Sequence, residues 1–144
     1  MMRHPSFRPL LALAFALLAL PAIAVDMVVI VSARSPVASL RQDQVADIFL
    51  GRAGHFPDGG EAVAIDQGLG SPLRNAFYMR VAATSPTALK VYWSKMIFTG
   101  RGKPPRELPD SAAVRQQVAG NPALIGYIDR ASFDASVRPV LVIR

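Results

Sequence analysis

The chain contains no cysteine, and its 144 residues include only two histidines and one tryptophan. The absence of cysteine excludes disulfides, so packing alone must stabilise the fold. His4 lies in a leader-like N-terminal segment, which leaves His55 as the only histidine in the rest of the chain. A histidine-dependent catalytic triad would have to use His55, in a glycine-rich loop without an obvious partner. Asp58 and Glu61 lie near it without a recognised ligand spacing. We therefore expect no catalytic residues, no metal site, no cofactor and no enzymatic activity.

Residues 1–24 have the three-part pattern of a cleavable signal peptide. A retained membrane helix is the alternative, but the apolar stretch is shorter than the roughly 20 residues that a transmembrane helix needs. We expect cleavage before Val25, a periplasmic location and no stable membrane anchor after cleavage. The pattern consists of basic Arg3, His4 and Arg8, an apolar core over residues 10–20, and the small-residue site Ala22-Ile23-Ala24.

Residues 25–144 are long enough for one domain with a real core and too short for two. Because Arg3 and Arg8 lie in the leader, the formal charge falls from +6 to +4 without it. That moderate charge does not indicate nucleic-acid binding. We expect a single domain.

Strand-like and helix-like segments alternate along this domain. The helix near residue 45 has an apparent capping box at Ser39 and Gln42, and two later helices start at Ser71-Pro72 and Ser85-Pro86. The order favours an α/β fold, a three-layer α/β sandwich with a mostly parallel sheet. The expected strands are residues 27–31, 62–65, 124–128 and 137–143. The expected helices start near 39, 71, 85 and 111, and residues 99–109 form a linker.

The segment from Asp66 to Phe77 is the best candidate for a binding site. A predicted strand ends at Asp66 and Gln67, the chain turns through glycines to Gly70, and a helix begins at Ser71. Such a helix start directs backbone N–H groups at one point, which attracts anions, and Arg74 adds a charge in the first turn. We predict an anion site at Asp66, Gln67, Gly70, Ser71 and Arg74.

Other candidates are weaker. Asp66 and Asp129 both end predicted strands, yet no pattern shows that they meet. Residues 100–103 resemble part of a phosphate loop but lack its leading strand and its Ser or Thr after the lysine. The charges of Arg101, Lys103 and Arg106 are typical of a solvated basic loop.

Four motifs in order resemble the substrate-binding proteins of phosphate-type ABC importers, in the periplasmic binding protein type 2 superfamily. The resemblance covers essentially all of residues 25–144. Residues 44–52 are similar to the family's LADIFxG helix, and 56–60 match a glycine-rich turn. Residues 71–74 lie where the family has Ser-Gly-Thr-Arg, and 123–128 are close to its GAIGYI strand.

The resemblance implies one lobe of such a protein and a role in binding phosphate or another oxyanion. The family's proteins have two lobes, whereas residues 25–144 suffice for one. Only Ser71 and Arg74 match the Ser-Gly-Thr-Arg motif. Pro72 removes one N–H donor, and an ionised Asp66 would repel a phosphate dianion. We therefore expect weak anion binding, or none.

Two functions follow from different readings of the chain. The first is an extracytoplasmic solute-binding protein for phosphate or a similar small anion, working with an ABC permease or another envelope protein. The second is an envelope protein-interaction module that keeps the fold without a ligand. It would use an exposed apolar or basic surface around residues 99–106.

Overall fold

The computed structural model describes residue 2 and residues 26–144. Apart from residue 2, the predicted signal peptide and its cleavage site before Val25 fall outside the described residues. Among the residues that are described, no helix has the length and apolar character needed to cross a membrane.

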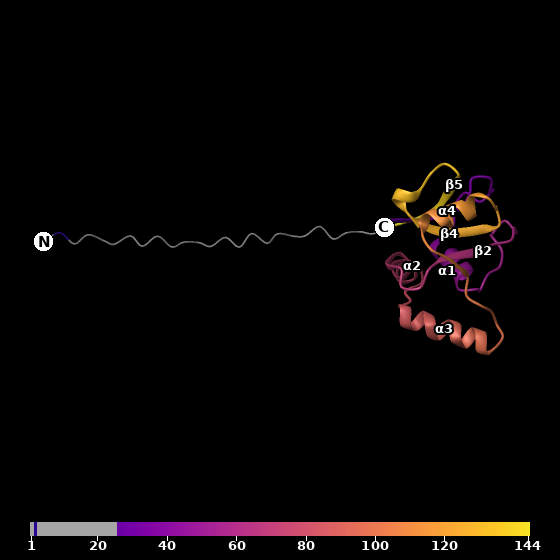
Figure 1. Cartoon of the computed structure of the whole chain (residues 1–144), viewed down its shortest axis with the longest axis horizontal. Coiled ribbons are helices and arrows are strands. Elements are labelled where there is room, and N and C mark those ends of the chain that lie inside the picture. Colours follow the sequence, from indigo (N-terminus) through magenta and orange to yellow (C-terminus); the bar gives the residue numbers. More distant parts are fainter. Residues whose placement is uncertain (1, 3–25) are drawn as a thin grey trace.

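Five strands form one twisted sheet in the order β3-β2-β4-β1-β5 (Figure 1). β2 pairs in parallel with β3 and β4, whereas β1 is antiparallel to both β4 and β5. The sheet is therefore mixed rather than mostly parallel. The sequence could not predict this, because the β-branched composition of a strand indicates its burial but not its direction. The strands are β1 (Met27–Ser32), β2 (Val63–Gln67), β3 (Arg106–Leu108), β4 (Leu124–Asp129) and β5 (Val137–Ile143).

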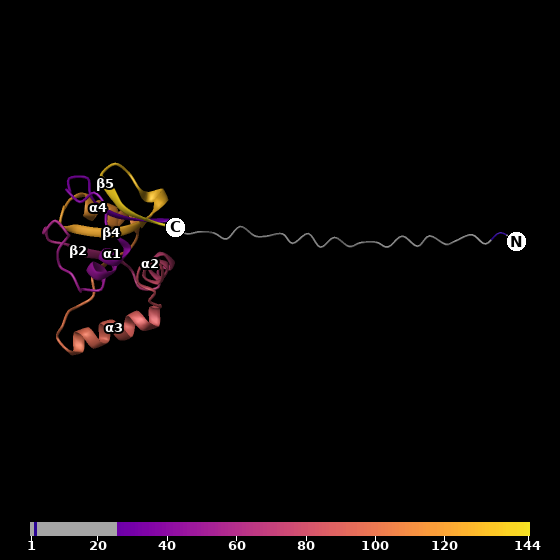
Figure 2. The ribbon, with the colours of Figure 1, turned by 180° about the vertical axis from the view of Figure 1, so that it is seen from behind.

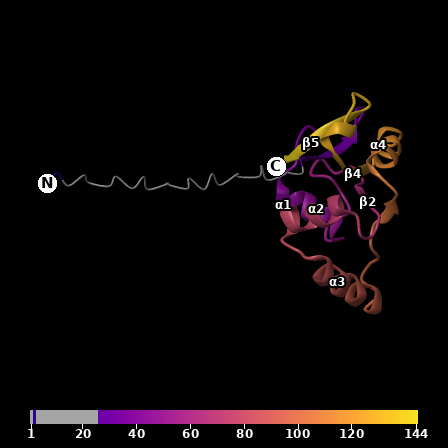
Figure 3. The ribbon, with the colours of Figure 1, turned by 60° about the vertical axis from the view of Figure 1, so that its left-hand side comes forward.

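Helices cover both faces of this sheet, which confirms the three-layer α/β sandwich. Side chains of β1 alternate between two cores: Met27, Val29 and Val31 belong to the core under α1 and α2, and Val28 and Ile30 to the core under α4. Figure 3 shows α1 and α2 on one side of the sheet and α4 on the other. The helices are α1 (Gln42–Phe49), α2 (Pro72–Ala82), α3 (Pro86–Phe98) and α4 (Ser111–Ala119), with a 3₁₀ turn at Arg130–Ser132.

The start of α1 differs from the prediction. The helix begins at Gln42, and the Gln44 Oε1 accepts a hydrogen bond from the Arg41 N–H at 2.9 Å. The Gln42 side chain instead donates to the Arg80 carbonyl at 3.0 Å. The N-cap is therefore Arg41, two residues later than the Ser39 that the sequence predicts.

α3 lies at the periphery of the molecule, beyond α1 and α2 (Figures 1 and 2). The apolar side chains of α3 are buried only in part, because Leu89 and Trp93 are buried while Ile97 is 57% exposed. The Tyr92 hydroxyl donates to the Leu50 carbonyl at 2.6 Å. α3 therefore rests on the body through a few large side chains.

Candidate functional site

The turn between β2 and α2 forms as predicted, and some of its backbone donors are already used. Ser71 caps α2, and its Oγ accepts from the Arg74 N–H at 3.3 Å. The Ser71 N–H itself donates to the Gly68 carbonyl at 3.1 Å, and Pro72 has no N–H. Gly70 makes the turn with φ +81°, a conformation that favours glycine. The available positive charge here is therefore the Arg74 side chain.

Arg74 is buried, with only 7% of its surface exposed. Its Nε lies 3.4 Å from the Asp66 Oδ2, within ion-pair distance but without hydrogen-bond geometry. Its terminal nitrogen lies 3.9 Å from the Glu107 Oε1. The guanidinium also lies over the Tyr78 ring, 5.5 Å from its centroid. Two carboxylates therefore already neutralise the residue that the sequence singled out as the anion ligand.

Asp66 is the centre of a buried hydrogen-bond network. It is 1% exposed, and its Oδ2 accepts from the Tyr78 hydroxyl at 2.5 Å. Its Oδ1 accepts from the Tyr127 hydroxyl and from the Gln67 N–H, the latter at 2.8 Å. With two tyrosines, a backbone amide and an arginine around it, this carboxylate is well satisfied inside the protein.

Burial raises the pKa of the Tyr78 and Tyr127 hydroxyls far above the ordinary value near 10, and the negative charge of Asp66 raises both further. Both tyrosines are therefore protonated at neutral pH. Each donates its proton to Asp66 in a hydrogen bond. The two rings thus hold the Asp66 carboxylate in place as donors rather than as acids.

The five predicted site residues have three different positions. Gly70 and Arg74 line a cavity, whereas Asp66 and Gln67 lie buried behind it. The Gln67 amide nitrogen donates to the Ser111 Oγ at 3.1 Å and to the Tyr127 carbonyl at 3.0 Å. Gln67 therefore ties β2 to α4 and β4, and Ser71 serves as a helix cap.

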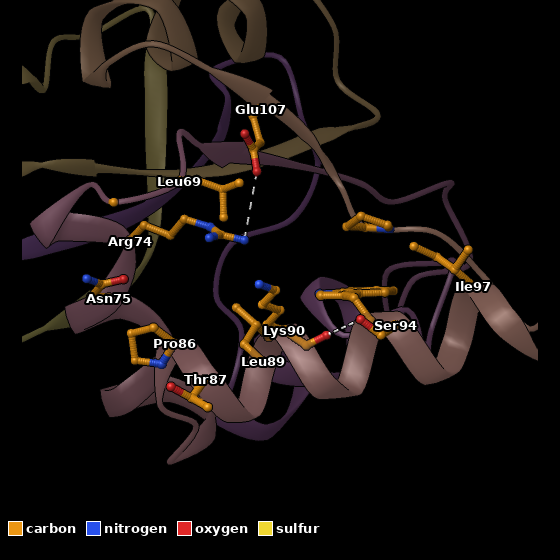
Figure 4. A pocket seen from close by; sticks show the side chains of 13 residues that line it. Leu69, Arg74, Asn75, Pro86, Thr87, Leu89, Lys90, Ser94, Ile97 and Glu107 are labelled. Atoms are coloured by element: carbon orange, nitrogen blue, oxygen red, sulfur yellow. Dashed lines mark hydrogen bonds and ion pairs between the residues drawn. The ribbon is translucent and has the colours of Figure 1, made fainter.

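The cavity, which we call the α3 cleft, lies between α3, the β2–α2 turn and β3 (Figure 4). Its volume is about 500 Å³, within the range of sites for small organic molecules. Figure 4 shows the Lys90 side chain extending from α3 toward the Arg74 guanidinium, with Glu107 opposite. The residues that line it include Arg74, Lys90, Glu107, Leu89, Trp93 and Ile97.

Sequence reasoning missed Glu107, Tyr78 and Tyr127. Glu107 lies in a segment predicted to be a linker, but residues 106–108 form edge strand β3 beside β2. This strand has three residues and no buried face, so it carries no period-2 signal. Tyr78 and Tyr127 gave no signal either, because both read as ordinary core residues.

The other residues that the sequence analysis considered for a functional role do not line the α3 cleft. Among the described residues, no group of three or more His, Cys, Asp or Glu side chains is placed to hold a metal ion. His55 is exposed and forms a backbone bridge with Glu61. Asp129 caps the 3₁₀ turn by accepting from the Ser132 N–H at 2.8 Å. Arg101 and Lys103 are exposed in the loop after α3.

No protein-family model and no curated protein sequence matches the chain. Solved structures do match, each over 79% of this chain. A phosphate ABC transporter substrate-binding protein with bound phosphate from Clostridium perfringens is 23% identical, with a TM-score of 0.60 and 43% of its chain covered. An ABC-type phosphate transport receptor from Vibrio cholerae is 17% identical, with a TM-score of 0.63 and 44% covered. PstS from Borrelia burgdorferi is 13% identical, with a TM-score of 0.54 and 46% covered.

These similarities concern the fold, since all three identities are low. The chain spans less than half the length of each of these proteins. Its α/β sandwich therefore has the architecture of one part of the phosphate-binding transport proteins.

Proposed function

We propose that the protein is an extracytoplasmic solute-binding protein that takes phosphate or another small oxyanion at Arg74. The observation that carries this proposal is the position of Arg74, an arginine 7% exposed that lines a cleft of about 500 Å³. Lys90 adds a second cation at the same cleft. A partly desolvated arginine beside an open cavity attracts anions more strongly than one in bulk water.

Binding of a dianion such as phosphate should be weak. Asp66 and Glu107 lie within ion-pair distance of Arg74, so their charges oppose a second anion there. The helix start lacks two donors that could serve an anion, since the Ser71 N–H is bonded and Pro72 has none. Anion binding then rests on two cationic side chains rather than on a full set of donors.

The fold and the leader-like segment support the setting that we propose for this function. Solved structures with the same architecture are described as phosphate transport proteins, one of them with bound phosphate. We therefore propose a binding role rather than catalysis, in association with an ABC permease or another envelope protein. Residues 25–144 would act as a single lobe in the periplasm after removal of residues 1–24.

Isothermal titration of the purified protein with phosphate and with sulfate tests this function. We expect saturable binding with a dissociation constant above 1 μM, a binding free energy weaker than about 8 kcal/mol. Lys90→Ala should weaken binding a few-fold, since it removes one cation from the cleft. Lys95→Ala, which removes an exposed charge of the same helix, serves as the control and should leave binding unchanged.

Submicromolar affinity for phosphate would contradict the weakness that we derive from Asp66 and Glu107. If neither phosphate nor sulfate binds the protein at millimolar concentration, the proposed function itself is contradicted. Equal effects of the Lys90 and Lys95 variants would place the anion outside the α3 cleft.

One observation favours the second function, an envelope protein-interaction module. Phe98 at the end of α3 is 93% exposed and Ile97 is 57% exposed. Arg101 and Lys103 follow them in an exposed loop. Apolar and basic groups side by side suit a partner protein with an apolar, acidic surface. If neither phosphate nor sulfate binds in the titration above, this function becomes the preferred one.

A further inference from the structure

Two buried N–H donors beside the α3 cleft make no hydrogen bond within the described part of the protein. In the part of the chain that the structure describes, the Arg74 Nε and the Trp93 Nε1 are buried without a hydrogen bond. Both residues line the cleft. Buried N–H groups are nearly always paired, and an unpaired one is costly. The Arg74 Nε faces the Asp66 Oδ2 at 3.4 Å, so a ligand in the cleft would meet the terminal nitrogens of the guanidinium rather than its Nε.

The cleft is built for more than an inorganic anion. Leu89, Trp93 and Ile97 of α3 form one apolar wall, and Leu69 and Pro86 add apolar surface near Arg74. A phosphate ion would occupy a small part of the cavity of about 500 Å³ and leave the exposed side chains of Leu69 and Ile97 in contact with water. An apolar body attached to the anionic group would bury them.

The charges of the cleft fit a single negative charge. Arg74 and Lys90 point toward each other, which favours an anion between them (Figure 4). Glu107 lies 3.9 Å from Arg74, and Asp66 lies behind it at 3.4 Å, so a dianion meets two carboxylates. A carboxylate carries one charge and presents two acceptor oxygens to the planar guanidinium.

We infer that the α3 cleft binds a monocarboxylate with an apolar body, of aromatic or branched aliphatic type. Its carboxylate lies between Arg74 and Lys90, and its body packs against Leu89, Trp93 and Ile97. This inference rests on the proposed function, in which Arg74 marks the anion site. It adds the ligand class, namely an organic acid rather than phosphate.

Phenylacetate is a suitable probe, with three comparison molecules that each lack one feature. Acetate lacks the apolar body, phenylethanol lacks the charge, and phosphate carries a different charge without an apolar part. Trp93 is the only tryptophan, so its fluorescence reports on the cleft directly, and calorimetry gives the affinity. We expect phenylacetate to bind at least about tenfold more tightly than each of the three.

Matched variants on α3 measure separately how the apolar body and the anionic group of the ligand contribute to affinity. Ile97→Ser should weaken phenylacetate binding several-fold and leave phosphate binding unchanged, because Ile97 lines the cleft. Val91→Ser changes a similarly exposed residue of the same helix, 64% against 57% exposed, and should have no effect. Lys90→Ala should weaken the binding of both phenylacetate and phosphate.

Phenylacetate binding no tighter than acetate would overturn the inference. If phosphate still binds and depends on Lys90 in that case, the proposed function stands without it. If neither anion binds, both the inference and the proposed function fail. Phenylacetate binding that is insensitive to Ile97→Ser and Lys90→Ala would also overturn the inference, because the ligand would then lie elsewhere.

Discussion

Replacement of Asp66 by alanine should lower the free energy of unfolding by about 3–5 kcal/mol. The carboxylate is buried and accepts from the Tyr78 and Tyr127 hydroxyls, and it lies 3.4 Å from Arg74. Its loss leaves the Arg74 guanidinium buried beside a single, partly exposed carboxylate, Glu107. It also leaves two buried hydroxyls without an acceptor. Urea denaturation followed by circular dichroism measures the change.

A matched control separates burial from the simple loss of an acid. Asp43→Ala removes a carboxylate that pairs with Arg41 at 3.0 Å on the exposed surface of α1. It should leave the free energy of unfolding close to that of the wild type, because exposed ion pairs contribute little. Asp66→Asn keeps one acceptor oxygen and should cost less than Asp66→Ala. A loss below about 1 kcal/mol for Asp66→Ala would contradict the network as the stabilising centre of the site.

Replacement of Phe77 by alanine should cost about 3–5 kcal/mol of unfolding free energy. The ring is fully buried and stacks on Tyr127 with their centroids 3.9 Å apart. It also packs against the rings of Phe49 and Tyr78, with centroid distances of 4.7 Å and 5.1 Å. The cavity left behind would remove contacts from three aromatic rings at once, and two of these rings hold Asp66.

Phe98→Ala is the matched control for this substitution. The same side chain is removed, but Phe98 is 93% exposed, so the expected change is within about 0.5 kcal/mol of zero. Thermal and urea unfolding of both variants give the comparison. Similar losses for the two would show that the aromatic cluster of Phe77 does not stabilise the fold as its packing indicates.

The helix starts of the site were predictable because their signals are local. Ser71-Pro72 and Ser85-Pro86 each place a capping hydroxyl and a proline together, and both serines cap the helices they precede. A cap needs only residues three or four positions away. The α/β sandwich was predictable for a related reason, since each segment carries its own period.

The state of Arg74 could not be predicted, because its partners lie on other elements. Tyr127, which donates to Asp66, is 61 residues away in sequence. Glu107 lies on a three-residue edge strand without an apolar pattern. Whether an arginine at a helix start is free or neutralised depends on such distant contacts, and no local spacing encodes them. The position of the site was therefore accessible from the sequence, while its charge balance was not.

The most direct test of the account is a phosphate titration of Glu107→Gln beside the wild type. The central claim is that Arg74 binds the anion and that neighbouring carboxylates restrain it. Glu107 lies 3.9 Å from Arg74 and is 38% exposed, so its neutralisation should raise phosphate affinity about two- to fivefold. Glu61→Gln, at an exposed acid that does not line the cleft, should leave the affinity unchanged. Unchanged or weaker phosphate binding by Glu107→Gln would contradict the claim.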